Sequence, residues 1–260
     1  MNILETIIAY KKLEVRNRKS EINFSELEKR KLFSRETISL KEALTVEKNT
    51  GIIAEFKRRS PSKGIINDTA KIEDVVKSYE TNGAAGISVL TDEKFFGGSY
   101  LDLMKAREIA GIPLLRKDFI VDEYQVVEAK SIGADVILLI AACLTPAEVK
   151  KLSGVAGNMG LEILLELHEE KELDHLCDDA DLIGINNRNL KTFGVDIDKS
   201  LRMAEMIPAD KIKIAESGIN SVEDIRLFRE NGFVGFLIGE NFMKEKDPGK
   251  AFEEFVIKMK

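Results

Sequence analysis

"NGAAGISVL" (residues 82–90) decides the fold, because the same order of residue types recurs twice further along the chain. A glycine closes a helical pattern, and an apolar run begins almost at once. "SIGADVILLI" (131–140) and "NGFVGFLIG" (231–239) repeat this order. Glycine commonly ends helices in the left-handed conformation, so each stretch predicts a helix that stops and leads into a buried strand. A recurring unit of this kind indicates a repeated β/α architecture.

Eight apolar runs of strand length follow residue 50. Several are apolar throughout rather than alternating, which is typical of parallel strands covered on both faces. The segments between them show the spacing of amphipathic helices. The eight runs are 51–56, 86–90, 113–116, 135–140, 161–167, 181–186, 211–216 and 235–239.

This alternation predicts an α/β fold, a (β/α)8 TIM barrel with an N-terminal helical extension. The chain has no dinucleotide-binding fingerprint and no sign of a reversed strand order, which argues against an open doubly wound sheet. Mixed-charge helical patterns fill residues 1–50, ahead of the first strand. We expect them to pack on the barrel as part of a single domain spanning 1–260; an exposed helical tail is the alternative.

Composition excludes several classes of function. The chain has 260 residues, 44% of them hydrophobic, and a net charge of −6, which argues against binding to nucleic acid. No apolar run reaches the roughly 20 residues of a membrane span, and no signal peptide is evident, so we expect a cytoplasmic protein that does not bind membranes. Cys143 and Cys177 form no ligand-like cluster with His168 and His175, so neither a disulfide nor a metal site is predicted.

Polar side chains gather where the predicted strands end, which in barrels of this kind is where functional residues lie. Side chains two apart on a strand share a face, so Glu55 and Lys57 can point together into the barrel. A solvated layer of mutually neutralising charges is the alternative for one such pair. Five strand ends with acids, amines or amides favour acid/base chemistry instead. These residues are Glu55, Lys57, Arg116, Lys117, Asp118, Glu166, Asn186, Arg188, Glu216 and Ser217.

A phosphate site is predicted on one side of the same end of the barrel. Ser217-Gly218 and Gly239-Glu240 each follow a strand and open onto a helix, where backbone N–H groups favour anions. The loop after the first strand adds Ser60 and several cations, namely Lys57, Arg58, Arg59 and Lys63. We therefore expect a phosphorylated small molecule as ligand.

These motifs, in this order, resemble those of the indole-3-glycerol phosphate synthase family over residues 54–243. The motifs are "AEFKRRSPSKG", "VLTDEKFFGGS", "LRKDFI", "LLELH", "IGINNRNL", "AESGI" and "FLIGENFM". The resemblance implies the substrate 1-(o-carboxyphenylamino)-1-deoxyribulose 5-phosphate, which ring closure, decarboxylation and dehydration convert to indole-3-glycerol phosphate, CO₂ and water. It implies no metal and no organic cofactor.

The resemblance also implies roles for individual residues. Lys117 is expected to be the general acid that protonates the substrate ketone. Glu166 and Lys57, the latter paired with Glu55, are expected to serve the dehydration, and the sequence leaves open how the lysines divide acid and base roles.

The family resemblance assigns the substrate-binding residues as well. Asn186 is expected to hold substrate hydroxyls, and Arg188 to pair with the anthranilate carboxylate. Phe95 and Phe119 are candidates for the wall against the aromatic ring, with ordinary core packing as the alternative. The expected phosphate ligands are Ser60, Ser217, Gly218 and Gly239. Glu240 departs from the Ser or Thr that some relatives carry there, which leaves its part in the phosphate site open.

Two other functions are the alternatives. Phosphoribosylanthranilate isomerase, a related barrel, places a cysteine after its first strand and an aspartate after its sixth, where this chain has Glu55/Lys57 and Asn186. A barrel that binds a phosphorylated metabolite without turnover is the second alternative, and no sequence feature favours it. The sequence does not determine the oligomeric state, for which we expect a monomer.

Overall fold

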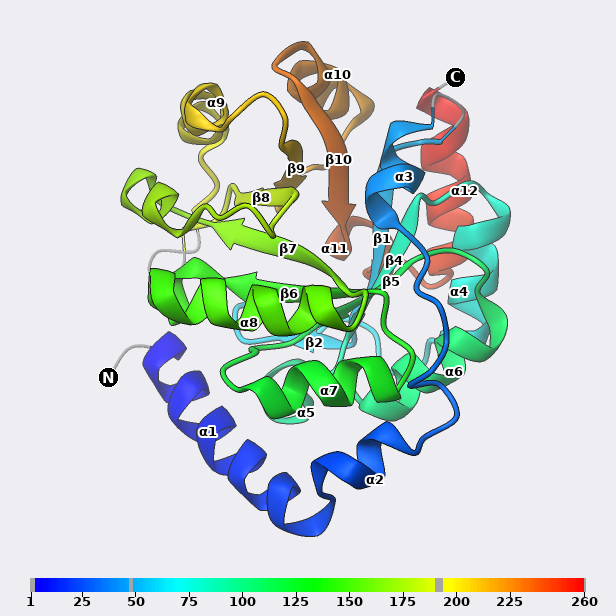
Figure 1. Ribbon diagram of the computed structural model, residues 1–260. Helices are drawn as coiled ribbons and strands as arrows, with labels where there is room; N and C mark the ends of the chain where they lie inside the picture. The colour runs from blue at the N-terminus through cyan, green and yellow to red at the C-terminus, as the bar shows by residue number, and fades with distance from the viewer. Residues whose placement is uncertain (1–2, 47–48, 190–193, 260) are drawn as a thin grey trace.

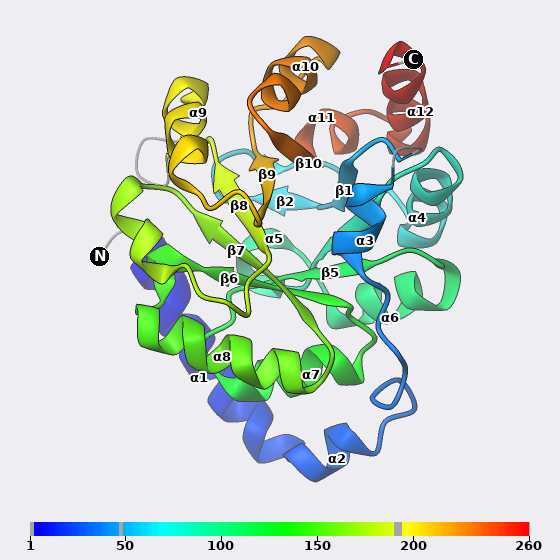
Figure 2. The same cartoon turned by 45° about the horizontal axis from the view of Figure 1, so that its top comes forward.

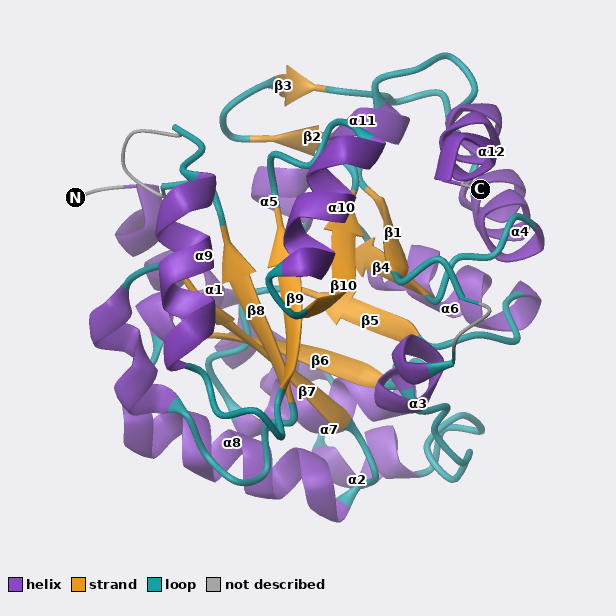
Figure 3. Cartoon of the chain, turned by 90° about the horizontal axis from the view of Figure 1, so that it is seen from above, coloured by secondary structure: helices purple, strands orange, loops and turns teal. Residues whose placement is uncertain are grey.

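A closed barrel of eight parallel strands forms the centre of the computed structural model, which describes residues 3–46, 49–189 and 194–259. Figure 3 views this barrel from above. Its strands follow one another around the barrel in the order β1-β10-β9-β8-β7-β6-β5-β4. Their bounds are β1 Ile52–Phe56, β4 Gly86–Leu90, β5 Leu114–Lys117, β6 Val136–Ile140, β7 Glu162–Leu167, β8 Leu182–Asn186, β9 Ile212–Glu216 and β10 Phe233–Ile238.

Helices surround the barrel on its outside (Figures 1 and 2). They alternate with the strands, except that the short 3₁₀ helix η2 (Glu170–His175) occupies the place of an α-helix after β7. None of the helices in the described ranges combines the length and the apolar character needed to cross a membrane. The surrounding helices are α4 Ile72–Thr81, α5 Glu93–Phe96, α6 Tyr100–Ile109, α7 Glu123–Ser131, η1 Ala141–Cys143, α8 Pro146–Asn158, α9 Ile197–Met206, α10 Val222–Glu230, α11 Glu240–Met243 and α12 Pro248–Met259.

The predicted fold class is confirmed, with all eight predicted strands in the closed barrel. Most strand starts were predicted one residue too early, and β10 begins at Phe233, two residues before the predicted start. That strand carries a register shift between Phe233 and Gly235. The loop after β1 was not predicted to contain strands, but it forms the antiparallel hairpin of β2 (Arg59–Ser60) and β3 (Gly64–Ile65).

Three helices precede the barrel: α1 (Ile3–Glu21), α2 (Phe24–Glu28) and α3 (Leu40–Thr45). As Figure 1 shows, α1 and α2 lie outside the ring of helices and contact α7. The described part of the N-terminal extension therefore packs on the barrel. Four positions of the predicted domain's first 50 residues, 1–2 and 47–48, lie outside the described residues, and the single-domain organisation stays a prediction.

Side chains alternate in direction along each strand, which produces two apolar cores, one inside the barrel and one between the barrel and the helices. Residues such as Ile53, Leu115 and Leu164 point into the barrel, while their strand neighbours face the helices. Leu40 and Leu44 of α3 join the inner cluster. A Cβ at the first residue of β4, Gly86, would come within 2.8 Å of Leu40 Cδ1. Thus α3 closes the N-terminal end of the barrel, and the opposite end stays available for the site.

We predict that Leu40→Ala lowers the free energy of unfolding by about 2–5 kcal/mol, the usual cost of a cavity in a close-packed core. Leu40 is 1% exposed. Urea unfolding measures the loss. Leu13→Ala is the control, because Leu13 on α1 is 51% exposed and should change stability by less than about 0.5 kcal/mol. Equal losses in the two variants would contradict the role given to α3.

Candidate active site

A pocket of about 340 Å³ opens at the C-terminal end of the barrel, here called the mouth. The alternation of side chains along β1 explains why the site lies there. Ile53 points into the inner core, so Glu55 and Lys57, two and four residues further on, point toward the same barrel axis nearer the C-terminal end. Apolar residues of the inner core, Leu138 and Leu237, also line it. The predicted site residues in its lining are Glu55, Lys57, Ser60, Lys117, Phe119, Glu166, Asn186, Arg188, Ser217, Gly218 and Gly239.

Lys117 at the end of β5 is held between two carboxylates from two other strands, β7 and β9. Its Nζ donates to Glu166 Oε2 at the end of β7 and to Glu216 Oε2 at the end of β9, each at 2.7 Å. All three side chains are largely buried, with 14%, 5% and 2% of their surface exposed. The mouth therefore contains an ammonium group with two acids within direct proton-transfer distance.

The surroundings shift the pKa values of Lys117, Glu166 and Glu216 by different amounts and in different directions. Burial alone would lower the pKa of Lys117, but Glu166, Glu216 and Glu55 outweigh it and raise this pKa. Burial raises the pKa of Glu216 to about 8; Lys117 opposes the rise and Glu166 adds to it. For Glu166, burial is outweighed by Lys117 and His168, which hold its pKa well below the ordinary range. At neutral pH the site thus contains one ionised and one protonated carboxyl group.

Two further side chains contact Glu166 at its other oxygen. Asn186 at the end of β8 donates from Nδ2 to Glu166 Oε1 at 3.2 Å. His168 is 3% exposed and places Nε2 3.1 Å from the same oxygen. Asn186 was a predicted site residue, whereas no role at this site was predicted for His168. The available signal was the position of His168 directly after β7 and two residues beyond Glu166, because this spacing puts both side chains on one face of the chain.

Lys57 and Glu55 form the predicted pair, with Lys57 Nζ donating to Glu55 Oε1 at 2.6 Å. Gly239 lies directly beside this pair: a Cβ there would overlap the Glu55 carboxylate. Gly239 was predicted as a phosphate ligand. In the structure, its missing side chain makes room for Glu55.

The loop after β9 has an uncommon backbone conformation. Ser217 and Gly218 both have positive φ angles, 66° and 71°. The conformation costs energy at a serine, and Asn187 stabilises it by donating to the Ser217 carbonyl at 2.7 Å. A Cβ at Gly218 would come within 2.5 Å of Val195 Cγ1, so glycine is required there by its φ and by its neighbour.

The aromatic wall differs from the one predicted. Phe119 lines the pocket, but its aromatic neighbour there is Phe96, and Phe95 is not part of the lining. The rings of Phe96 and Phe119 lie 5.9 Å apart. Phe95 instead packs edge-on against Tyr10 of α1, with ring centroids 5.9 Å apart. These adjacent residues at the end of α5 point in different directions, and no sequence feature distinguishes them.

The basic loop also differs in part from the expected cluster around an anion. Lys57 lines the pocket, but Arg58 is turned away and pairs with Asp102 of α6. Glu240 lines the pocket as well and pairs with two cations, Arg188 at 3.3 Å and Lys63 at 3.5 Å. Glu240 therefore neutralises part of the local positive charge.

Glu216 was one of the polar strand ends in the sequence, but no catalytic or binding role was predicted for it. The alternation of side chains along β9 indicated that Glu216 faces into the barrel. Ile212 and Ile214 face the inner core, and Glu216 is the next residue with the same spacing of two. Gly184 on the neighbouring strand leaves the space, since a Cβ there would overlap the Glu216 carboxylate. No group of three or more acidic, histidine or cysteine side chains suited to hold a metal ion occurs in the described part of the chain.

The fold and this mouth define a (β/α)8 barrel enzyme with acid/base side chains over an apolar pocket. The chain belongs to the indole-3-glycerol phosphate synthase family, whose model matches residues 4–255. It is 47% identical over 255 residues to indole-3-glycerol phosphate synthase of Bacteroides thetaiotaomicron, covering 98% of each chain. The enzyme of that name from Carboxydothermus hydrogenoformans is 42% identical, with 96% of this chain and 98% of the relative covered. The family consists of carboxy-lyases of tryptophan biosynthesis.

Solved structures support the fold independently of close sequence similarity. The tryptophan synthase α subunit of Legionella pneumophila superposes with a TM-score of 0.62 at 13% identity, covering 85% of this chain and 96% of that one. The thiamine phosphate pyrophosphorylase of Pyrococcus furiosus gives 0.58 at 17% identity, over 80% and 95% of the two chains. At such low identity these likenesses concern the barrel alone.

We predict that Glu216→Gln flattens the dependence of stability on pH. The pKa of Glu216 in the folded protein, about 8, lies above its ordinary value of 4.5. Its contribution to stability is therefore complete below pH 4.5 and is lost as pH rises through about 8. Urea unfolding across this window should show a steeper fall for the unchanged protein than for Glu216→Gln.

The exposed Glu230 of α10 offers a matched control. Glu230→Gln should leave the slope of stability against pH unchanged. A Glu216→Gln protein whose slope equals that of the unchanged protein would show that Glu216 titrates in its ordinary range.

Proposed function

We propose that the protein converts 1-(o-carboxyphenylamino)-1-deoxyribulose 5-phosphate to indole-3-glycerol phosphate, CO₂ and water. The observation that carries this proposal is the ammonium of Lys117 between Glu166 and Glu216, facing an apolar pocket with aromatic side chains. Ring closure of this substrate needs an acid at the ketone, and its dehydration needs an acid and a base. The family relationship supports the same reaction.

Lys117 is the proposed general acid of ring closure. Its raised pKa keeps the proton on nitrogen while both carboxylates contact it. When the substrate ketone oxygen replaces one of these contacts, the ammonium loses part of that stabilisation and becomes a stronger acid. Protonation of the ketone lets the ring carbon that bears the carboxylate form a bond to the carbonyl carbon. Loss of CO₂ then returns the electron pair to the ring and restores its aromaticity.

Glu166 is the proposed base of the dehydration, and Lys57 assists it. Glu166 is held ionised at neutral pH, as a base must be, and Asn186 fixes one of its oxygens. Removing a proton from the ring-closed intermediate while the hydroxyl leaves as water completes the indole. Lys57, paired with Glu55, is the second cation available to protonate that leaving hydroxyl. Glu216, protonated at neutral pH, can return a proton to Lys117.

The remaining lining residues are proposed to bind and orient the substrate. Phe119 and Phe96 are placed to contact the aromatic ring, Phe96 taking the role expected of Phe95. Arg188 and Lys57 supply positive charge for the anthranilate carboxylate, and Asn186 can donate to substrate hydroxyls. The proposed phosphate ligands are Ser60, Ser217, Gly218 and Gly239, all in the pocket lining. The strained backbone at Ser217 supports a functional role for that loop.

The direct test is turnover of this substrate by EDTA-treated protein, followed by the fluorescence of the indole product. We predict turnover by the unchanged protein, and a fall in kcat by about 10²- to 10⁴-fold in Lys117→Met, the usual cost of a lost general acid. Lys150→Met on the exposed face of α8 should retain full activity. No product from the unchanged protein would refute the proposed function, and a loss confined to KM would assign Lys117 to binding.

A further inference from the structure

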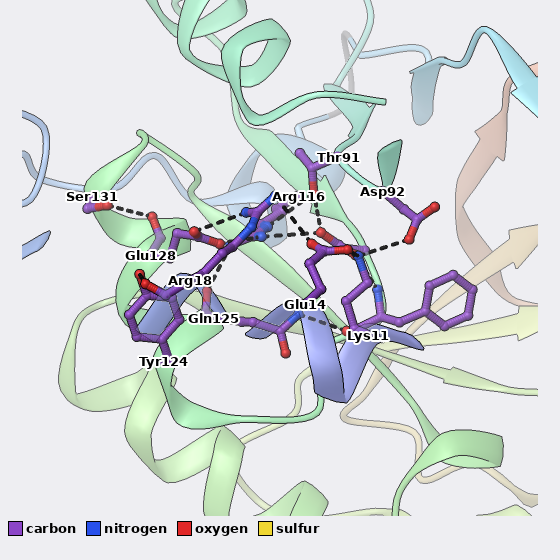
Figure 4. A network of polar contacts seen from close by, with 12 residues as sticks. Lys11, Glu14, Arg18, Thr91, Asp92, Arg116, Tyr124, Gln125, Glu128 and Ser131 are labelled. Atoms are coloured by element: carbon purple, nitrogen blue, oxygen red, sulfur yellow. Dashed lines mark hydrogen bonds and ion pairs between the residues drawn. The ribbon is translucent and has the colours of Figure 1, made fainter. Parts of the chain in front are cut away.

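Lys11 of α1 is buried at the edge of the mouth, although its helix lies outside the barrel. Its side chain has 0% of its surface exposed. Placing an ammonium group in such a site costs several kcal/mol unless partners offset the lost hydration. Three carboxylates do so, Asp92 at 2.9 Å, Asp118 at 3.0 Å and Glu14 at 3.2 Å. Figure 4 shows Lys11 reaching from α1 into this network.

Asp92 and Asp118 come from the ends of two neighbouring strands, β4 and β5, and each holds a backbone N–H of an aromatic residue. Asp92 accepts from the N–H of Phe95 at 2.7 Å and of Phe96 at 3.3 Å, which caps α5. Asp118 accepts from the N–H of Phe119 at 2.8 Å. One buried cation therefore joins the two loops that carry Phe96 and Phe119.

The network continues on the side of Asp118 away from Lys11, where further residues hold its second carboxylate oxygen. Arg116, 1% exposed, pairs with Asp118 at 3.2 Å and with Glu128 of α7 at 2.7 Å. Thr91 donates to Asp118 Oδ2 at 2.6 Å. Asp92, in contrast, lies 2.9 Å from Lys11, and no ion pair to another cation is found for it within the described ranges. Lys11 is thus the charge on which the position of the α5 loop depends most.

We propose that Lys11 is a positioning residue for substrate binding, which acts through Asp92 and Asp118 to hold Phe96 and Phe119 against the aromatic ring of the substrate. This inference rests on the proposed function for the identity of that ring. Ring contacts of this kind exist before and during the reaction, so their loss weakens binding without slowing the chemical step. The role places a helix outside the barrel in control of the pocket's aromatic wall.

Lys11→Met tests the role, because methionine keeps an apolar stem of similar length and removes the charge. We expect KM for the substrate to rise by about tenfold while kcat stays within about threefold. NMR hydrogen exchange should show faster exchange of the Phe96 and Phe119 amides. Lys12→Met is the matched control, since Lys12 is the exposed neighbour on the same helix, and it should change neither quantity.

A second variant separates positioning from stability. Lys11→Met combined with Asp92→Asn removes one charge of each sign, and the asparagine oxygen can still accept at the α5 cap. We expect this double variant to recover stability in urea unfolding but to retain the raised KM. Recovery of KM together with stability would reduce Lys11 to a structural role and overturn the inference.

Unchanged amide exchange in Lys11→Met would also overturn it, as would an unchanged KM in an active enzyme. These outcomes differ from failure of the proposed function, which would appear as absent turnover in the unchanged protein. The exchange measurement needs no substrate, so in either case it shows whether Lys11 holds the backbone at Phe96 and Phe119.

Discussion

The pairing of one buried ammonium with two buried carboxylates at the mouth is the constraint on which the rest of the site depends. Removing Lys117 from water costs several kcal/mol before its partners contribute. Glu166 and Glu216, both at 2.7 Å, offset that cost. Burial and the nearby Glu166 carboxylate raise the pKa of Glu216 to about 8, so this acid retains its proton at neutral pH. The site is therefore supplied at neutral pH with a base, an acid and an ammonium.

Barrel geometry makes this grouping possible. Lys117, Glu166 and Glu216 end strands β5, β7 and β9, which are not adjacent in the barrel; the closed sheet turns all three toward one axis. Space for the carboxylates comes from glycines of neighbouring segments, Gly184 of β8 beside Glu216 and Gly239, directly after β10, beside Glu55. These two glycines are thus explained by the room that their missing side chains leave for the carboxylates of Glu216 and Glu55.

Much of this could be predicted from the sequence. Apolar runs and helix-ending glycines predicted all eight barrel strands, and parity along them indicated which polar residues face inward. Contacts between distant segments could not be predicted. Nothing in the sequence indicated that Glu216 pairs with Lys117, or that Lys11 pairs with Asp92. The choice between Phe95 and Phe96 depended on the cap of α5 and on Tyr10 of α1. Each of these depends on where two chain segments meet.

Difference infrared spectroscopy of the carboxyl groups tests the central claim most directly. At a pH between 4.5 and about 8, the spectrum of the unchanged protein minus that of Glu216→Gln should contain the carbonyl band of a protonated carboxylic acid. Above the upper end of that range the band should be replaced by carboxylate absorption. A difference spectrum with carboxylate bands alone throughout the range would contradict the account, because Lys117 would then lie between two ionised acids.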